Sequence, residues 1–342
     1  MKVISHLVRF SVAAVLTASA FAAHAQSVEE FYKKKPITLL VYSGAGSSYD
    51  FYARLLSRHL GAHMPGKPNI IVQNMVGAGG YKLVDYLNRI APRDGSVIAT
   101  VTRGLPFDPM LGKTEIPFEP LEFTWLGSMN REIAVALSWN TSKIKTFADL
   151  QKSELIVPGT GVGADSEIIP RAYNVLAGTK FKIIAGYRDT AEAALQMETG
   201  ELAGIGYWSW SAIAGGHPDW PRDKKINVLF HTGLEEVPGV AGVPRIRDLV
   251  TDPTDKKALE FLLAREIIGR PYLAPPGVPA DRAKALRDGF NATMKSKDFI
   301  ADAQRSNIEV HLVTAKEVED VIREAAQSPQ PVIDRVKEIL GR

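Results

Sequence analysis

The feature that most constrains the fold of this chain is a unit in which an apolar strand ends in a glycine-rich loop that leads into a helix. Its first copy spans residues 36–63, with an apolar run at 36–42 and a loop that contains Gly44 and Gly46. A continuous apolar run that follows Pro and ends at Gly is typical of a strand buried on both faces of a sheet. Apolar residues at three- and four-residue spacing then predict a helix, and Ser47 with Asp50 predicts its N-terminal cap.

This unit recurs along the chain. Gly-rich or polar loops follow four further predicted strands, which span residues 69–73, 96–101, 155–157 and 181–185. Alternating strands and helices joined by short loops predict an α/β protein. Because such sheets bind ligands outside the carboxyl ends of their strands, and because helix N-termini attract anions, these loops are the candidate binding elements.

The order of the units predicts two lobes. A Pro-rich, aperiodic stretch at 107–122 separates the first three units from the others, and Gly and Pro residues at 237–243 mark the return. After it we expect a helix at 256–265, a strand at Ile267-Ile268 and three amphipathic helices, at 280–294, 315–326 and 331–340. We predict lobe I from 26–128 plus 238–342 and lobe II from 129–237, each a mainly parallel sheet flanked by helices, with a ligand cleft between the lobes.

The first 25 residues predict a cleavable secretory signal. Lys2 and Arg9 precede an apolar run at 10–23, which ends in Ala23-His24-Ala25. We expect cleavage after Ala25 and an exported protein. After the leader no stretch approaches about 18 uninterrupted apolar residues, so we expect no stable membrane insertion. The chain contains 0 Cys, which excludes disulfides and thiolate metal sites.

Charge and motifs argue against several function classes. The formal charge of +3 includes Lys2 and Arg9 of the leader, which leaves +1 and disfavours nucleic acid as a partner. The sequence has no G-x-S-x-G, H-E-x-x-H or Walker A motif, and its histidines lack metal-ligand spacing. Tyr49 stands where a dinucleotide fingerprint would have its third Gly. We therefore predict no catalytic residue, no metal and no cofactor.

Seven short motifs occur in order after the leader. They are Lys35-Pro36-Ile37, Gly44-Ala45-Gly46-Ser47-Ser48-Tyr49-Asp50, Gln73-Asn74-Met75-Val76-Gly77-Ala78-Gly79-Gly80, Ala91-Pro92-Arg93-Asp94-Gly95, Pro158-Gly159-Thr160-Gly161, Gly186-Tyr187 and Ala274-Pro275-Pro276-Gly277-Val278-Pro279. In this order they resemble the substrate-binding proteins of tripartite tricarboxylate transporters, also known as Bug-type periplasmic receptors. The resemblance covers nearly the whole chain after the leader.

The resemblance implies a two-lobed, monomeric receptor that closes on a small organic carboxylate and delivers it to membrane subunits of a transporter. In that family, backbone N–H groups and ordered water hold the carboxylate, at loops that match residues 43–48 and 160–166. With the other strand-end loops, the predicted ligand-binding residues are Ser43, Gly44, Ala45, Gly46, Ser47, Ser48, Asp50, Gly77, Ala78, Gly79, Thr102, Arg103, Thr160, Gly161, Val162, Gly163, Ala164, Asp165, Ser166, Tyr187, Arg188 and Trp208.

Two departures from the family pattern bear on the ligand. Residues 200–203 lack the family's second-lobe aspartate, and Gly46-Ser47-Ser48 replaces the commoner Gly-Gly-x. Arg103 and Arg188 would favour a ligand with a second anionic group, or else pair with neighbouring acids. Trp208 would stack on an aromatic ligand, or else pack in the core. An exported hydrolase or decarboxylase with the same cleft, and a ligand sensor for a membrane kinase, stay open as alternative functions.

Overall fold

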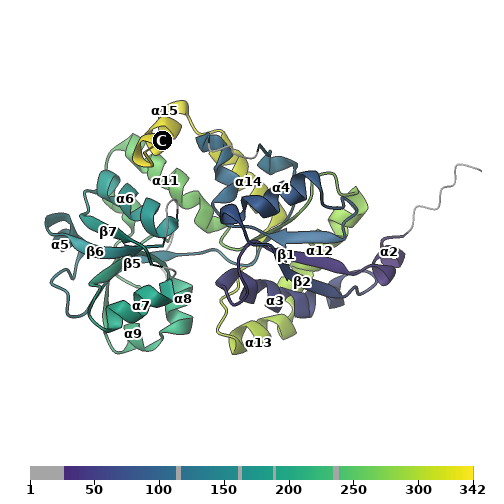
Figure 1. The fold of residues 1–342 in the computed structure, drawn as a ribbon, viewed down its shortest axis with the longest axis horizontal. Coiled ribbons are helices and arrows are strands. Elements are labelled where there is room, and N and C mark those ends of the chain that lie inside the picture. The colour runs from purple at the N-terminus through teal and green to yellow at the C-terminus, as the bar shows by residue number, and fades with distance from the viewer. Residues whose placement is uncertain (1–26, 113–116, 161–163, 188–189, 234–238, 342) are drawn as a thin grey trace, which may run out of the picture.

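The structure is a computed structural model that describes residues 27–112, 117–160, 164–187, 190–233 and 239–341. Two lobes lie side by side, each with strands at its centre and helices around them (Figure 1). No helix in these described ranges is long and apolar enough to cross a membrane. The predicted signal segment and its cleavage point lie outside the described residues.

Lobe I is built on a six-stranded sheet in the order β11-β4-β10-β3-β1-β2. The neighbours β1–β2 and β1–β3 are parallel, whereas β10 runs antiparallel to both β3 and β4. Consequently the carboxyl ends of the first three strands lie at one edge of the sheet. The strands are β1 (Ile37–Val41), β2 (Ile70–Asn74), β3 (Val97–Thr100), β4 (Thr124–Ser128), β10 (Pro271–Ala274) and β11 (Val313–Thr314).

Helices cover both faces of this sheet (Figure 1). The helix α3 buries Tyr52, Leu55, Leu56 and Leu60, and these residues belong to the same core cluster as the β1 side chains Ile37 and Leu39. The helical elements from residue 28 to residue 122 are α2 (Val28–Lys34), α3 (Ser48–Leu60), η2 (Gly61–His63), η3 (Ala78–Gly80), α4 (Tyr81–Arg89), η4 (Leu105–Phe107), η5 (Pro109–Leu111) and η6 (Pro120–Glu122).

Lobe II has a three-stranded antiparallel sheet in the order β8-β5-β9 and a parallel pair, β6-β7. Its strands are β5 (Ala134–Trp139), β6 (Leu155–Gly159), β7 (Phe181–Ala185), β8 (Gly204–Ser209) and β9 (Ile226–His231). Its helices are α5 (Phe147–Lys152), α6 (Asp165–Ala177), α7 (Thr190–Glu198), α8 (Trp210–Gly216), α9 (Asp219–Arg222) and α10 (Ile246–Leu249).

The chain crosses between the lobes in the short segment from β4 to β5 and returns through α11 (Pro253–Ile267). The helix α11 contacts α6 on one side and the C-terminal helices α14 and α15 on the other (Figure 1). The remaining helices are α12 (Ala280–Lys295), α13 (Lys297–Arg305), α14 (Ala315–Ala326) and α15 (Gln330–Ile339). The packing of α11 therefore holds the residues at its C-terminal end, which include Arg265 and Glu266, between the two lobes.

The predicted α/β class and the two-lobed arrangement are confirmed, and so are the three amphipathic helices, which correspond to α12, α14 and α15. The mainly parallel sheet predicted for lobe II is wrong: β5 pairs antiparallel with both β8 and β9, and only β6 and β7 are parallel, because strand order depends on pairing between distant segments. The strand predicted at Ile267-Ile268 is wrong: α11 runs to Ile267, and the strand begins at Pro271. That strand inserts between β3 and β4 by antiparallel pairing, which no local pattern indicates. Residue 238, one of the predicted lobe boundaries, lies outside the described residues, but Arg245 still pairs with His231 of β9, so lobe II extends past that predicted boundary.

Candidate functional site

The loop between β1 and α3 presents the N-terminus of α3 at the carboxyl edge of the lobe I sheet. Its residues Gly44 to Gly46 are exposed, and Gly46 has a φ of +80°, which favours glycine. Ser47 caps the helix, since its Oγ accepts a hydrogen bond of 3.3 Å from the Asp50 N–H. Ser48 and Tyr49 are the first residues of α3, so their N–H groups have no carbonyl partner within the helix and favour an anion.

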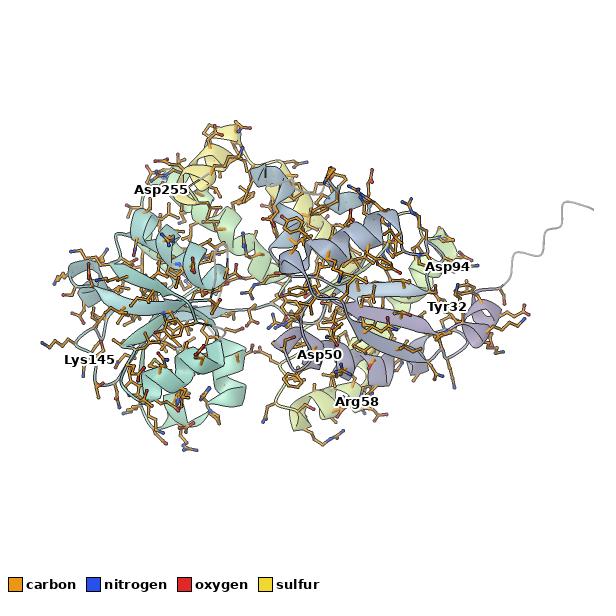
Figure 2. The ribbon with its side chains drawn as sticks, viewed as in Figure 1. Tyr32, Asp50, Arg58, Asp94, Lys145 and Asp255 are labelled. Carbon is orange, nitrogen blue, oxygen red and sulfur yellow. The ribbon has the colours of Figure 1, made fainter. Side chains whose placement is uncertain are left out.

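Asp50 fixes the shape of this loop. It is 1% exposed, and Figure 2 shows it near the middle of the molecule. Its carboxylate accepts hydrogen bonds from the Gly46 N–H at 2.9 Å, Arg54 Nε at 2.8 Å and Asn74 Nδ2 at 2.9 Å. Burial raises the pKa of Asp50, but these hydrogen bonds outweigh burial and hold it below its usual value. The predicted cap is therefore half formed, because the Asp50 side chain bonds Gly46 and leaves the Ser47 N–H to the Gly44 carbonyl.

Arg103, just past the end of β3, reaches across to lobe II. Its Nη2 donates to Asp165 Oδ2 at 3.1 Å and to Tyr207 Oη at 3.0 Å, and its Nη1 lies 3.9 Å from Glu132 Oε2. Arg103 itself is 9% exposed. Of the two roles predicted for Arg103, the structure shows pairing with an acid, and that acid is one of the predicted ligand-binding residues.

Asp165 is held by two arginines. It is the first residue of α6, where a negative charge is favoured by the helix dipole. Arg265, near the end of α11, donates from Nη1 to Asp165 Oδ1 at 3.1 Å, on the oxygen that Arg103 leaves free. Burial raises the pKa of Asp165, yet the charges of Arg103 and Arg265 outweigh it and keep the carboxylate ionised.

Arg270 completes the site, and the sequence prediction missed it. Its Nη2 donates to Ser48 Oγ at 2.9 Å and lies 3.3 Å from Glu132 Oε2. Its guanidinium carbon lies 4.5 Å from the centre of the Tyr49 ring and 5.1 Å from that of Tyr52. Arg270 thus places a buried positive charge at the N-terminus of α3, next to the exposed loop. No sequence signal distinguishes it among 41 Lys and Arg residues.

A third carboxyl group of the site belongs to α11 and contacts lobe II. Glu266 is 5% exposed and accepts a hydrogen bond of 2.6 Å from Tyr207 Oη. Burial raises the pKa of Glu266 to about 7, against the opposing effect of Arg103. We refer to Arg103, Arg265, Arg270, Glu132, Asp165 and Glu266 as the interlobe charge cluster.

The predicted second-lobe loop is described only at its two ends. The Thr160 N–H donates to Ser166 Oγ at 3.0 Å, and the two hydroxyl groups lie 2.8 Å apart. Ala164 is the residue before α6 and, like Ser166, is half-buried. Gly161, Val162, Gly163 and Arg188 lie outside the described residues.

The remaining predicted residues are spread over both lobes. Gly77, Ala78 and Gly79 form the turn before α4, and Thr102 directly precedes Arg103. Tyr187 is half-buried against the lobe II core. Trp208 is 7% exposed and lies with the rings of Trp220 and His217, each at a centroid distance of 5.7 Å, in that core. Trp208 therefore has the core position that was one of its two predicted roles.

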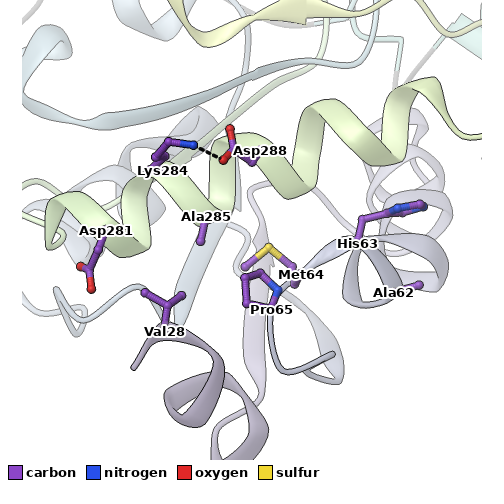
Figure 3. A pocket seen from close by; sticks show the side chains of 9 residues that line it. All are labelled: Val28, Ala62, His63, Met64, Pro65, Asp281, Lys284, Ala285 and Asp288. Atoms are coloured by element: carbon purple, nitrogen blue, oxygen red, sulfur yellow. Dashed lines mark hydrogen bonds and ion pairs between the residues drawn. The ribbon is translucent and has the colours of Figure 1, made fainter. Parts of the chain in front are cut away.

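A separate surface pocket lies on lobe I between α2, η2 and α12 (Figure 3). Its one lysine, Lys284, already pairs with Asp288, and its other lining residues include the acid Asp281. This lining offers no unpaired positive charge to an anion. Among the described residues, no group of three or more His, Asp or Glu side chains has the arrangement of a metal site.

Comparison with known proteins gives structural neighbours only. Neither protein-family models nor curated protein sequences match the chain. A TctC solute-binding protein from Polaromonas is 20% identical, with a TM-score of 0.67 over 91% of this chain and 99% of that one. The periplasmic binding protein BugD is 18% identical, with a TM-score of 0.65 over 90% and 98%. Rpa4515 of R. palustris, solved with adipate, is 16% identical, with a TM-score of 0.65 over 90% and 97%.

These neighbours match the chain along nearly its whole length. The similarity therefore extends over the whole two-lobed architecture and is not limited to one helix or strand. They include a TctC solute-binding protein and the periplasmic binding protein BugD, which are proteins of the kind that the ordered sequence motifs resemble. The fold of this chain is that of the TctC and BugD periplasmic solute-binding proteins.

Proposed function

We propose that the protein is a periplasmic receptor that captures a small organic carboxylate between its lobes and delivers it to a tripartite tricarboxylate-type membrane transporter. One observation carries the proposal: the buried guanidinium of Arg270 contacts Ser48 at the exposed N-terminus of α3. Helix N–H groups beside a fixed positive charge are a suitable site for a carboxylate. The fold and the adipate in the Rpa4515 structure support the same ligand class.

Binding in this arrangement involves both lobes. The α3 N-terminus belongs to lobe I, whereas Asp165 and Tyr207, which hold Arg103, belong to lobe II. A ligand closes two lobes when it binds the closed state better than the open one. A carboxylate seated at Ser48 would lie next to Arg270, which belongs to the interlobe charge cluster, and further contacts with lobe II would favour the closed state.

We treat Asp165 and Glu132 as structural partners of arginines, and Glu266 as a buried acceptor for Tyr207, and not as catalytic acids or bases. Asp165 contacts two guanidinium groups, and Glu132 lies within 4 Å of two. The proposal therefore assigns binding and no chemical reaction to this site.

Replacing Ser48 with proline should weaken carboxylate binding by about 10-fold or more, because it removes one N–H donor to a charged group. The substitution suits the helix: proline is favoured at the first helical position, and Ser47 has an extended backbone with a φ of −74° and a ψ of 162°. The affinity is measured by isothermal titration calorimetry, with a ligand found by its stabilising effect in a thermal-shift screen of organic acids and amino acids.

Ser48→Ala is the matched control, since it removes the hydroxyl group and keeps the N–H donor. If alanine and proline weaken binding equally, the N–H group of residue 48 does not hold the ligand. If no carboxylate raises the melting temperature while neutral solutes do, the receptor has another ligand class.

A further inference from the structure

The interlobe charge cluster determines how many carboxylates the site can accept. Each of its three guanidinium groups already has a protein carboxylate within 4 Å. Arg103 and Arg265 share Asp165, and Arg270 and Arg103 lie against Glu132. A ligand therefore does not meet three unpaired cations. The net charge of the cluster, after its arginines and carboxylates are summed, decides which acids can bind.

The charge sum of the cluster lies between 0 and about +1. Three arginines are offset by the ionised Asp165 and by Glu132, while Glu266, with its pKa raised to about 7 by burial, contributes between none and one further negative charge near neutral pH. This sum covers the six residues of the cluster. At its upper limit of about +1 the cluster balances one ligand carboxylate, whereas a second carboxylate would leave an uncompensated negative charge in a buried site at any value of this sum.

Asp165 also occupies the position where a second ligand carboxylate would find its partners. It lies at the N-terminus of α6 in lobe II, and both of its oxygens are bound by guanidinium groups, at 3.1 Å each. A ligand held by Ser48 in lobe I would extend toward this position if it were long enough to contact both lobes. Asp165 thus already occupies the two guanidinium groups that a second ligand carboxylate in lobe II would need.

We infer that the receptor selects organic acids with a single carboxylate, and that Asp165 excludes a second carboxylate by occupying Arg103 and Arg265. The inference rests on the proposed function and deepens it by naming the ligand class. It also reverses the expectation that Arg103 favours a second anionic group, because the structure shows that guanidinium already paired. A diacid would have to displace Asp165 from two arginines or lie beside it as a like charge, and both are unfavourable.

Two matched ligand pairs test the inference by isothermal titration calorimetry: hexanoate with adipate, and benzoate with terephthalate. Adipate has the carbon chain of hexanoate with a carboxylate in place of the terminal methyl group, and terephthalate has the ring of benzoate with a second carboxylate added opposite the first. In whichever pair binds to the unmodified protein, we expect the dissociation constant of the monoacid to be at least about 10-fold lower than that of the diacid. This ratio corresponds to about 1.4 kcal/mol. For Asp165→Asn we expect this preference to fall by about 10-fold, since the partners of Asp165 then accept the ligand's own second carboxylate.

Asp298→Asn is the control variant, because Asp298 is an exposed aspartate in the first turn of another helix, α13, and its loss should leave the preference unchanged. Equal or tighter binding of the diacid by the unmodified protein overturns the inference and leaves the receptor function standing. An unchanged preference in Asp165→Asn removes Asp165 as the selecting residue. If neither pair binds, the comparison is made with the monoacid and diacid of the ligand skeleton found in the thermal-shift screen; if no carboxylate in that screen binds, the proposed function loses its support and the inference falls with it. The comparison within the unmodified protein holds even if Asp165→Asn does not fold.

Discussion

Replacing Arg270 with methionine should lower the free energy of unfolding by about 3 kcal/mol, the cost expected when a buried ion pair loses one partner. Glu132 is 3% exposed, and without Arg270 its nearest remaining cation is Arg103, at 3.9 Å. The substitution also removes the contacts of the guanidinium with the Tyr49 and Tyr52 rings. Urea denaturation of the ligand-free protein at neutral pH measures the change.

Two comparisons identify the cause of that loss. Arg323→Met makes the same substitution in the exposed pair of Arg323 with Asp320, in which both side chains are more than 45% exposed. It should lower the free energy of unfolding by less than about 1 kcal/mol. Adding Glu132→Gln to Arg270→Met should recover part of the loss, since it removes the unpaired buried charge but keeps an acceptor for Ser211 Oγ. Equal losses for Arg270→Met and Arg323→Met would contradict a buried, strongly coupled pair.

Local sequence patterns were sufficient to predict the elements that carry the first binding loop. The apolar run before Gly44 became β1, and the spacing of Leu55, Leu56 and Leu60 became the buried face of α3. Both signals are local, because strand burial and helix periodicity are visible within a dozen residues. The strand order is not local: β10 pairs with β3 and β4, which precede it by more than 140 residues. No local sequence pattern in the paired segments predicts an antiparallel insertion of that kind.

The interlobe charge cluster shows the same limit for the site. Arg103 and Asp165 were both predicted to bind ligand, since each lies in a loop or at a helix start next to a strand end. Their pairing with each other could not be predicted, because it depends on how the two lobes meet. Arg265, Glu266 and Arg270 are buried near the end of α11, and Arg270 meets Ser48 across 222 residues of sequence. Only the packing of α11 between the lobes brings them to the site.

Glu266→Gln should remove a pH dependence of stability amounting to about 3 kcal/mol between pH 4.5 and pH 8. Burial raises the pKa of Glu266 from 4.5 to about 7 in the folded protein. The folded state therefore binds this proton more tightly than the unfolded state. Its contribution to stability is full below pH 4.5 and is lost as the pH rises through 7. Glutamine keeps an acceptor for Tyr207 Oη and does not titrate.

The measurement is the difference in free energy of unfolding between Glu266→Gln and the unmodified protein, from urea denaturation at pH 5, 6, 7 and 8. The difference should grow in favour of glutamine as the pH rises, because the unmodified protein must then bury an ionised carboxylate beside Tyr207. Other carboxyl groups whose pKa is lowered, such as Asp165 and Asp50, are common to both proteins and cancel. Glu119→Gln, at an exposed glutamate, is the control and should give a constant difference. Parallel pH profiles for Glu266→Gln and the unmodified protein would show that Glu266 is ionised throughout, and the charge cluster would then sum to zero at neutral pH.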